Sequence, residues 1–433
     1  MCCKEIDLVI IGGGSAGLAA AISAKENGIN DILIIEKENS LGGILNQCIH
    51  NGFGLQTFNE QLSGPEYAER YIDLINQLNI EYVLNSFVNQ ITKEKDVYYS
   101  NPIDGFVHIK AKAIVLSTGC VERTPGQIML EGRRISGVLT AGLAQKYLNI
   151  EGYSIGKKVF ILGSGDIGLI MARRLTLEGS KVLGVAEIMP YSNGLQRNIV
   201  QCLNDFDIPL FLSYTVKNVI GKNRVEKIVI AKVDENGKYI DGSEIEFECD
   251  TLILSVGLIP YNTLLNSLDV ELSPTKGPII DENYMTSIAG IFSCGNSLHV
   301  HDLVDYVSME GKEVGISVSK YLKNQLKSCQ KSTKIQPGNL ISYIVPHQYN
   351  YQDLSHPITI KYRVKKPVKN VEVILSIDGK AIKKIKKLAM HPSEMEILKL
   401  TKEELIDGKI LEIQIKENWS YERINMYWMS KRM

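Results

Sequence analysis

The chain has 433 residues, of which 44% are hydrophobic, so it can bury large cores, and its length predicts two to four domains. Its 48 basic and 49 acidic residues nearly cancel, which does not favour nucleic acid or a membrane surface as a partner. Eight cysteines without a Cys-x-x-Cys pair fit free thiols in a reducing cytoplasm and argue against a zinc or iron–sulfur site. The apolar stretch at residues 8–24 differs from a signal peptide, because it contains a glycine-rich turn and follows two acidic residues. We expect no membrane span elsewhere in the chain.

The first part of the chain has the order strand, turn, helix, strand. Residues 7–11 form a continuous β-branched run, as expected for a buried parallel strand, and residues 15–27 are alanine-rich and helical. Residues 31–36 predict the second strand, residues 65–78 have helical periodicity, and residues 113–117 predict a further buried strand. This pattern indicates an α/β domain with a parallel sheet.

The turn after the first strand has the pattern Gly-x-Gly-x-x-Gly. Gly12 makes the turn tight, Gly14 lets the backbone approach a pyrophosphate, and Gly17 lets helix and strand pack closely. The helix N-terminus offers amide donors and a partial positive charge to phosphates. Glu36, 19 residues after Gly17, would accept hydrogen bonds from ribose hydroxyls. The residues predicted for this cofactor site are Gly12, Gly14, Ser15, Ala16, Gly17, Glu36, Lys37 and Gly43.

A second unit of the same kind begins near residue 157, with strands at 159–162 and 181–186 on either side of a helix. Glu187 follows the last glycine of its turn by 19 residues, the same offset as in the first unit. No lysine or arginine occurs in the six residues after Glu187, and a carboxylate would repel a 2′-phosphate, so we favour NAD over NADP. The residues predicted for this second dinucleotide are Gly163, Gly165, Asp166, Ile167, Gly168, Glu187 and Gly257.

Two further segments suit the ribityl chain and ring of a flavin. Residues 116–119 form a strand that ends in a small-residue turn with Thr118 and Gly119, and residues 290–296 form another that ends in Gly295 and Asn296. We therefore expect the flavin on the first unit and the nicotinamide cofactor on the second. Two dinucleotides on one chain allow one cofactor to reduce the other.

The last part of the chain changes character. Residues 341–433 alternate apolar and polar side chains in period two, and Asp378-Gly379 is typical of a hairpin turn, so we predict a small antiparallel β domain. A segment rich in Ser, Thr, Lys, Pro and Gly at 328–339 predicts the linker. Basic residues exceed acidic ones from residue 336 onward, which fits either a docking surface or a solvated lysine-rich sheet face.

Together the motifs resemble the two-dinucleotide-binding-domain flavoproteins, also called pyridine nucleotide–disulfide oxidoreductases, over residues 5–325. The resemblance implies an α/β fold with two Rossmann-like, three-layer ββα domains of the glutathione-reductase kind, followed here by the C-terminal antiparallel β domain. It implies FAD at the first turn and NAD(H) at the second, with Thr118, Gly119 and Gly295 in flavin-contacting segments. Asn296 stands where that family has an aspartate, a neutral replacement. The expected domains are 1–120 and 259–330 for FAD, 121–258 for the inserted NAD(H) domain, and 336–433 for the β domain.

Segments 42–54, 161–173 and 294–304 also look like a narrower group, the bacterial subunits encoded beside an anaerobic-type glycerol-3-phosphate or amine/opine dehydrogenase flavoprotein. That resemblance implies passage of electrons between NAD(H) and the flavin of a partner dehydrogenase or electron-acceptor protein. The organic substrate, the direction of electron flow and the partner are not specified by the sequence.

The disulfide reductases of the superfamily carry Cys-x4-Cys shortly after Gly-Gly, and aligned on Gly43 those two positions are Leu45 and His50. We therefore expect an NAD(P)H oxidoreductase without that dithiol. Cys48 lies between the two positions, and either it is a packed, unreactive thiol or it reacts with peroxide, which would need a low pKa set by His50 or a helix N-terminus.

His299 and His301 alternate just after the proposed ribityl segment, and we expect them to line the flavin or to hold structural hydrogen bonds; no third metal ligand is evident. Three functions stay open: an electron-transfer subunit of a larger dehydrogenase, a stand-alone NADH oxidase or peroxide reductase that uses Cys48, and a flavin-binding assembly protein without enzymatic activity. A homo-oligomer is compatible with each.

Overall fold

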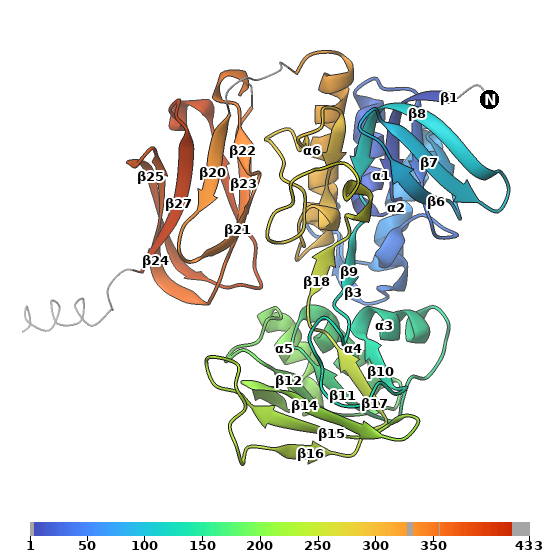
Figure 1. The fold of residues 1–433 in the computed structure, drawn as a ribbon, viewed down its shortest axis with the longest axis vertical. Helices are drawn as coiled ribbons and strands as arrows, with labels where there is room; N and C mark the ends of the chain where they lie inside the picture. The colour runs from blue at the N-terminus through green and yellow to red at the C-terminus, as the bar shows by residue number, and fades with distance from the viewer. Residues whose placement is uncertain (1–3, 327–331, 355, 418–433) are drawn as a thin grey trace, which may run out of the picture.

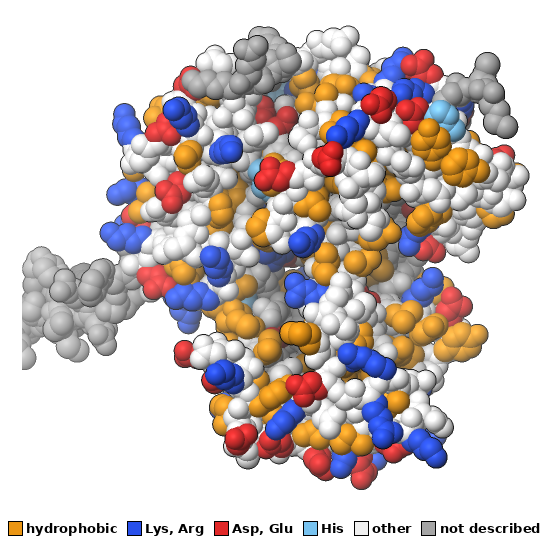
Figure 2. Space-filling model, in the orientation of Figure 1, with side chains coloured by type: hydrophobic (Ala, Val, Ile, Leu, Met, Phe, Trp, Pro, Cys, Tyr) orange, Lys and Arg blue, Asp and Glu red, His pale blue; other side chains and the backbone are white. Residues whose placement is uncertain are grey.

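Three bodies of β structure make up the computed structural model, which describes residues 4–326, 332–354 and 356–417. Two of them lie side by side with helix α6 (Val304–Leu322) between them, and the third lies below (Figure 1). The surface is hollowed where the lower body meets the two upper ones (Figure 2). No helix in these described ranges combines the length and apolar character needed to cross a bilayer.

The first body is built on a seven-stranded sheet with the order β5-β2-β1-β8-β7-β6, in which β19 pairs with the other side of β8. The central strands are parallel and completely apolar where they are buried, whereas β6, β7 and the start of β8 form an antiparallel extension. Because β19 follows the second body in sequence, the chain leaves this sheet and returns to it. The strands are β1 (Lys4–Ile11), β2 (Ile32–Ile35), β5 (Glu81–Val83), β6 (Phe87–Ile91), β7 (Asp96–Asn101), β8 (Gly105–Leu116) and β19 (Ile291–Ser293).

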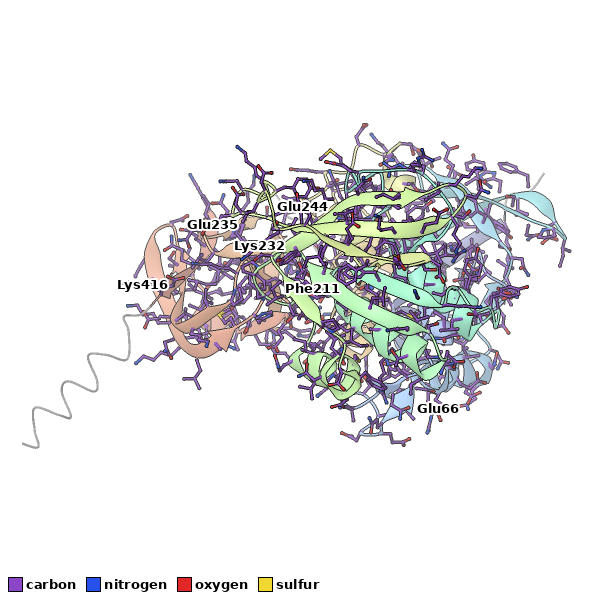
Figure 3. The ribbon with its side chains drawn as sticks, turned by 90° about the horizontal axis from the view of Figure 1, so that it is seen from below. Glu66, Phe211, Lys232, Glu235, Glu244 and Lys416 are labelled. Atoms are coloured by element: carbon purple, nitrogen blue, oxygen red, sulfur yellow. The ribbon has the colours of Figure 1, made fainter. Side chains whose placement is uncertain are left out.

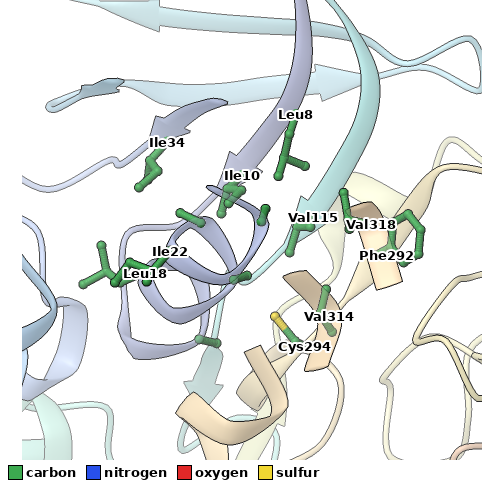
Figure 4. Packing of buried hydrophobic residues seen from close by; sticks show 14 of the residues in the cluster. Leu8, Ile10, Leu18, Ile22, Ile34, Val115, Phe292, Cys294, Val314 and Val318 are labelled. Atoms are coloured by element: carbon green, nitrogen blue, oxygen red, sulfur yellow. The ribbon is translucent and has the colours of Figure 1, made fainter. Parts of the chain in front are cut away.

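Helices α1 (Ser15–Glu26) and α6 pack against each other on one face of this sheet. Their close approach needs glycine, because a Cβ at Gly311 would lie 2.3 Å from the carbonyl oxygen of Ala16. Leu8, Ile10, Val115, Phe292 and Val314 fill the space between sheet and helices (Figure 4). Helix α2 (Gly64–Gln77) closes the layer and begins with a capping box between Ser63 and Glu66.

The second body has a parallel five-stranded sheet with the order β10-β17-β11-β12-β13, covered by helices on one face and by an antiparallel three-stranded sheet on the other. Phe211 lies between the two sheets (Figure 3), and its ring contacts Phe160 and Phe247. This arrangement is the predicted three-layer ββα unit. Its elements are β10 (Val138–Thr140), α3 (Ala141–Asn149), β11 (Lys158–Leu162), α4 (Asp166–Leu177), β12 (Lys181–Glu187), α5 (Gln196–Cys202), β13 (Leu210–Leu212), β14 (Tyr214–Gly221), β15 (Val225–Lys232), β16 (Ile245–Phe247) and β17 (Thr251–Leu254).

Two antiparallel strands, β9 (Cys120–Glu122) and β18 (Leu258–Pro260), carry the chain between the first and second bodies (Figure 1). The short β3 (Asn51–Phe53) and β4 (Leu62–Ser63) form a hairpin on the first body that faces the second. A 3-10 helix (Gly43–Gln47) precedes this hairpin, and Gln47 donates a hydrogen bond of 2.9 Å to the carbonyl oxygen of Gly142 on α3.

The third body is a sandwich of a five-stranded sheet, β22-β20-β27-β24-β25, and a three-stranded sheet, β21-β23-β26. The predicted Asp378-Gly379 turn joins β24 to β25 with positive φ angles of 47° and 82°. One pair, β20 with β27, is parallel, so the body is antiparallel except at that pair. Its strands are β20 (Thr333–Pro337), β21 (Ile341–Val345), β22 (Gln348–Tyr349), β23 (Ile358–Val364), β24 (Val368–Ile377), β25 (Lys380–Met390), β26 (Glu396–Leu400) and β27 (Ile410–Glu417).

These three bodies confirm the predicted fold class, two parallel Rossmann-like sheets with a C-terminal β region. The part of the alternating segment after residue 417 lies outside the described residues. The exact domain boundaries stay a prediction.

Candidate functional site

The first glycine-rich turn lies at the carboxyl end of β1, and two of its glycines are required by the protein itself. Gly12 has φ +108°, and a Cβ there would lie 2.4 Å from the carbonyl oxygen of Ser117. A Cβ at Gly17 would lie 2.0 Å from the carbonyl oxygen of Gly12. By contrast, a Cβ at Gly14 would meet no protein atom within 4 Å. The protein's own packing does not require glycine at this position. A glycine beside open space therefore fits a turn whose backbone closely approaches a ligand.

The N-terminus of α1 leaves its first amides available. Gly14 is the N-cap and offers no side chain to bond the amides of Ser15, Ala16 and Gly17, and the first turn carries no acidic residue. The first-turn amides of a helix and the positive end of its dipole together attract phosphate. The donor set therefore fits a pyrophosphate.

Glu36 is buried at the end of β2, and its carboxylate accepts hydrogen bonds from both the glycine-rich turn and the loop that follows β2. One carboxylate oxygen accepts a hydrogen bond of 2.6 Å from the amide of Gly13, and the other accepts one of 2.8 Å from the amide of Glu38. Lys37, between them, is exposed and pairs with Glu38 at 3.2 Å. The carboxylate is thus held beside the open face of the turn.

The segments expected at the flavin meet at the same edge of the sheet. Gly43 lies against Gly14, since a Cβ at Gly43 would be 3.1 Å from the Cα of Gly14. Thr118 donates a hydrogen bond of 2.6 Å to the carbonyl oxygen of Tyr261, and Gly119 has φ +70°. A Cβ at Gly295 would lie 2.7 Å from the Cβ of Ala16. Strands β1, β8 and β19 therefore bring Gly12, Gly14, Ala16, Gly43, Gly119, Gly295 and Asn296 to one end of the sheet.

The second turn repeats the tight glycines and the buried glutamate at the end of β11, but Asp166 places a carboxylate in the first turn of α4. Gly163 has φ +97°, and a Cβ there would lie 2.0 Å from the carbonyl oxygen of Ser255. Ser255 also accepts a hydrogen bond of 3.1 Å from the amide of Gly168. Glu187 accepts 2.9 Å and 2.6 Å hydrogen bonds from the amide and hydroxyl of Ser164. Each turn therefore has the same three supports: tight glycines, a buried glutamate on the next strand, and a serine that follows a neighbouring strand.

Ser117 and Ser255 are the supports that sequence reasoning missed. Ser117 donates hydrogen bonds of 3.0 Å and 2.9 Å to the carbonyl oxygens of Ile11 and Gly12. The signal was present, because each serine directly follows a buried apolar run that ends in leucine. Its meaning depends on pairing β8 with β1 and β17 with β11, which the local sequence does not reveal.

The remaining predicted residues of the second turn have structural contacts. The Asp166 carboxylate accepts hydrogen bonds from the amide of Leu195 at 2.8 Å and the side chain of Asn198 at 2.6 Å, so it anchors α5. Ile167 packs against the core of the second body. Gly165 is less open than Gly14, with a Ser255 oxygen 3.3 Å from its Cβ position, and Gly257 has φ +102°.

Cys48 does not have the properties of a reactive thiol. Its sulfur donates to the carbonyl oxygen of Ile44 at 3.3 Å and lies 3.8 Å from the side-chain oxygen of Gln145. Burial raises the pKa of the Cys48 thiol to about 12, so it stays protonated near neutral pH. His50 contacts Asn51 and the ring of Phe53, and burial lowers the pKa of its imidazole. A raised thiol pKa does not favour peroxide chemistry, which requires a thiolate.

His299 and His301 occupy positions different from those expected for flavin-lining groups. Their side chains are 0% and 1% exposed, so neither faces open space. His299 donates from Nε2 to a Glu310 carboxylate oxygen at 2.9 Å, and burial lowers the pKa of His299 to about 3, which keeps it neutral. Lys361 of β23 lies 2.5 Å from the same oxygen. The expected lining role does not fit this closed cluster, whereas structural hydrogen bonding does.

Glu310 completes a group with the two histidines that could in principle ligate a metal ion. Its carboxylate already faces the Lys361 ammonium, which supplies the positive charge that a metal would bring. Sequence reasoning missed Glu310 and Lys361, because they lie on a helix and in a separate β domain with no motif around them.

Comparison with known proteins agrees with this geometry. The family model described as pyridine nucleotide-disulphide oxidoreductase matches residues 6–318. The mitochondrial dihydrolipoyl dehydrogenase of Caenorhabditis elegans is 26% identical over 71% of this chain and 66% of its own length. One opine oxidase subunit, from Agrobacterium tumefaciens (strain Ach5), is 25% identical over 67% of this chain and 61% of its own length. These alignments thus span less than two thirds of either relative.

Thioredoxin reductase from T. acidophilum, a solved structure, has a TM-score of 0.59 at 21% identity and covers 73% of this chain and 98% of its own. That likeness concerns the fold. Members of the matched family typically bind FAD and NAD(P)H. The family model covers most of the chain, and its residues include both turns described above. The chain therefore belongs to the pyridine nucleotide-disulphide oxidoreductase family and is a flavin-dependent oxidoreductase.

Proposed function

We propose that this chain moves hydride or electrons between NAD(H) and a bound FAD, as one subunit of a larger dehydrogenase. The observation that carries the proposal is the repeated turn: two tight glycine turns, each with its own buried glutamate, on one polypeptide. In this proposal Gly12, Gly14 and Glu36 help to hold FAD, and Gly163, Gly168 and Glu187 help to hold NAD(H). The cofactors supply the redox chemistry, and the chain supplies binding, orientation and exclusion of water.

Three features support a role within a larger complex. Leu45 and His50 stand where the disulfide reductases of this superfamily have their two cysteines, so a dithiol route to substrate is not proposed. The opine oxidase relative is by its name one subunit of an assembly. The β domain, proposed to span residues 336–433, lies outside the matched residues 6–318 and extends the molecule beyond the family's shared part. A partner dehydrogenase flavoprotein, of the glycerol-3-phosphate or amine/opine kind, is the proposed electron donor or acceptor.

NADH is expected to reduce the bound flavin faster than NADPH, because the buried Glu187 carboxylate would repel a 2′-phosphate. Anaerobic mixing of FAD-loaded protein with either nucleotide, followed at the flavin absorbance band, measures the two rates. Failure of both nucleotides to bleach the flavin would contradict the proposed function and favour a non-enzymatic assembly role. A preference for NADPH would contradict only the assignment of Glu187.

Cys48→Ser is expected to leave the NADH-to-dye rate unchanged within about twofold, because the thiol is protonated and makes only weak contacts. Steady-state assays with an artificial electron acceptor, and in parallel with hydrogen peroxide, measure this. Cys202→Ser, a buried thiol in the second body, is the matched control. If Cys48→Ser alone removed peroxide turnover, the stand-alone peroxide reductase would become the better description.

A further inference from the structure

Glu310 is the centre of a buried polar cluster at the contact between the first body and the β domain. Its side chain is 0% exposed and both of its carboxylate oxygens are engaged. One oxygen accepts a hydrogen bond of 2.7 Å from the amide of Gly295, and the other faces His299 and Lys361. Burial by itself would raise the pKa of Glu310, but Lys361 and the two histidines lower it well below 4.5, so the carboxylate is ionised.

Lys361 is the cation that balances this carboxylate, and it comes from a different domain. Its side chain is 6% exposed, and its ammonium also donates to the hydroxyl of Tyr284 at 3.3 Å. Lys361 Nζ lies 2.5 Å from this carboxylate oxygen and His301 Nε2 lies 3.4 Å from it, so Lys361 is the nearest basic group to Glu310. Leaving either charge buried without the other is strongly unfavourable. The β domain therefore reaches into the first body with a side chain that Glu310 needs.

Glu310 in turn holds the segment that ends β19. The amide of Gly295 has Glu310 as its acceptor, and Gly295 itself lies against Ala16 in the first turn of α1. The neighbouring Asn296 accepts a hydrogen bond of 3.0 Å from the amide of His301. A shift of the Glu310 carboxylate would thus move the turn at Gly295 and Asn296 relative to the phosphate-binding end of α1.

We propose that Lys361 is a positioning residue for the flavin site: by holding Glu310 it fixes the Gly295–Asn296 turn, which makes the β domain a required part of FAD binding. This inference rests on the proposed function, because it takes the turn to contact the flavin. It gives the β domain a role within the chain, apart from any contact with a partner protein.

The test compares Lys361→Met with Lys361→Arg, with the double variant Lys361→Met/Glu310→Gln, and with Lys384→Met as the control. Lys384 is an exposed lysine of β25 in the same domain. Three quantities are measured: the dissociation constant for FAD, the midpoint potential of the bound flavin, and the hydrogen-exchange rate of residues 291–298 in the FAD-free protein.

Lys361→Met is expected to weaken FAD binding by about tenfold or more and to speed exchange at residues 291–298, because the Glu310 charge loses its partner. The midpoint potential should become more negative, since the Glu310 carboxylate beside the Gly295–Asn296 turn loses its cation and disfavours added electrons. Lys361→Arg, which keeps the charge, and the double variant, which removes both charges, should return all three quantities toward the unchanged chain. Lys384→Met should change none of them.

Unchanged FAD affinity, potential and exchange in Lys361→Met would overturn the inference, as would stoichiometric metal bound at the two histidines of the purified chain. If Lys361→Met does not fold, Lys361→Gln, which can still donate a hydrogen bond to Glu310, is measured instead with the same expectations. A chain that binds FAD and is reduced by NADH but is indifferent to Lys361 overturns this inference alone. A chain that binds no FAD at all contradicts the proposed function.

Discussion

Gly163→Ala is expected to slow reduction of the flavin by NADH by about 100-fold or more while FAD stays bound. The substitution places a Cβ 2.0 Å from the Ser255 carbonyl oxygen, and it does so at a φ of +97° that alanine rarely adopts. The turn must move by a distance comparable to the overlap, and misplacement on the order of 1 Å can cost about 100-fold in rate. Stopped-flow absorbance with NADH measures the loss, and dithionite should still bleach the flavin.

Gly179→Ala separates the steric clash from backbone strain. Gly179 follows α4 with φ +85°, yet a Cβ there would meet nothing within 4 Å. This control is expected to cost about 1–2 kcal/mol of stability through its left-handed backbone and to leave the NADH rate unchanged. A Gly163→Ala protein that NADH reduces at the original rate would show that the second turn does not hold the nucleotide.

Asp302→Ala is expected to destabilise the contact between the β domain and the first body by about 3–5 kcal/mol. Asp302 pairs with the guanidinium of Arg363, and both side chains are largely buried. Arg363 also donates to the carbonyl oxygens of Val300 at 3.1 Å and Pro392 at 2.9 Å, so its position is fixed from both domains. Removing the carboxylate leaves a buried positive charge and an amide of Met395 without its 2.7 Å acceptor. Urea unfolding monitored by fluorescence and circular dichroism measures the loss.

The exposed pair of Lys93 and Asp269 provides the comparison. Its side chains are 50% and 87% exposed, so Lys93→Met is expected to cost far less stability than Asp302→Ala. The double variant Asp302→Ala/Arg363→Met should recover most of the stability lost in Asp302→Ala, because no unpaired charge remains. Equal losses in Lys93→Met and Asp302→Ala would show that the buried pair does not hold the domains together.

The parts of this molecule that the sequence predicts are those with local causes. A β-branched strand, a glycine-rich turn and an alanine-rich helix follow one another directly in the chain, so the turns at Gly12 and Gly163 could be found in advance. The glutamates at the ends of β2 and β12 follow at a fixed offset, because strand and helix lengths set that distance. The Asp378-Gly379 hairpin was predictable for the same reason.

The parts that the sequence does not predict depend on contacts between distant segments. Nothing around Lys361 distinguishes it from the other lysines of its domain, and its importance arises from Glu310, which lies 51 residues earlier on α6. The position of His299 after the Gly295 turn suggests a cofactor-lining group, but the β domain covers this side chain and keeps it neutral. The sequence around Cys48 allows either a packed or a reactive thiol, and only its burial shows that the pKa is raised.

The central claim is that two dinucleotides bind one chain, each at its own glycine turn. A structure determined with FAD and NAD⁺ present tests this most directly. The account predicts FAD at the α1 turn beside Glu36 and NAD⁺ at the α4 turn beside Glu187. Density for either cofactor at another place, or an empty α1 turn in a chain saturated with FAD, would contradict it.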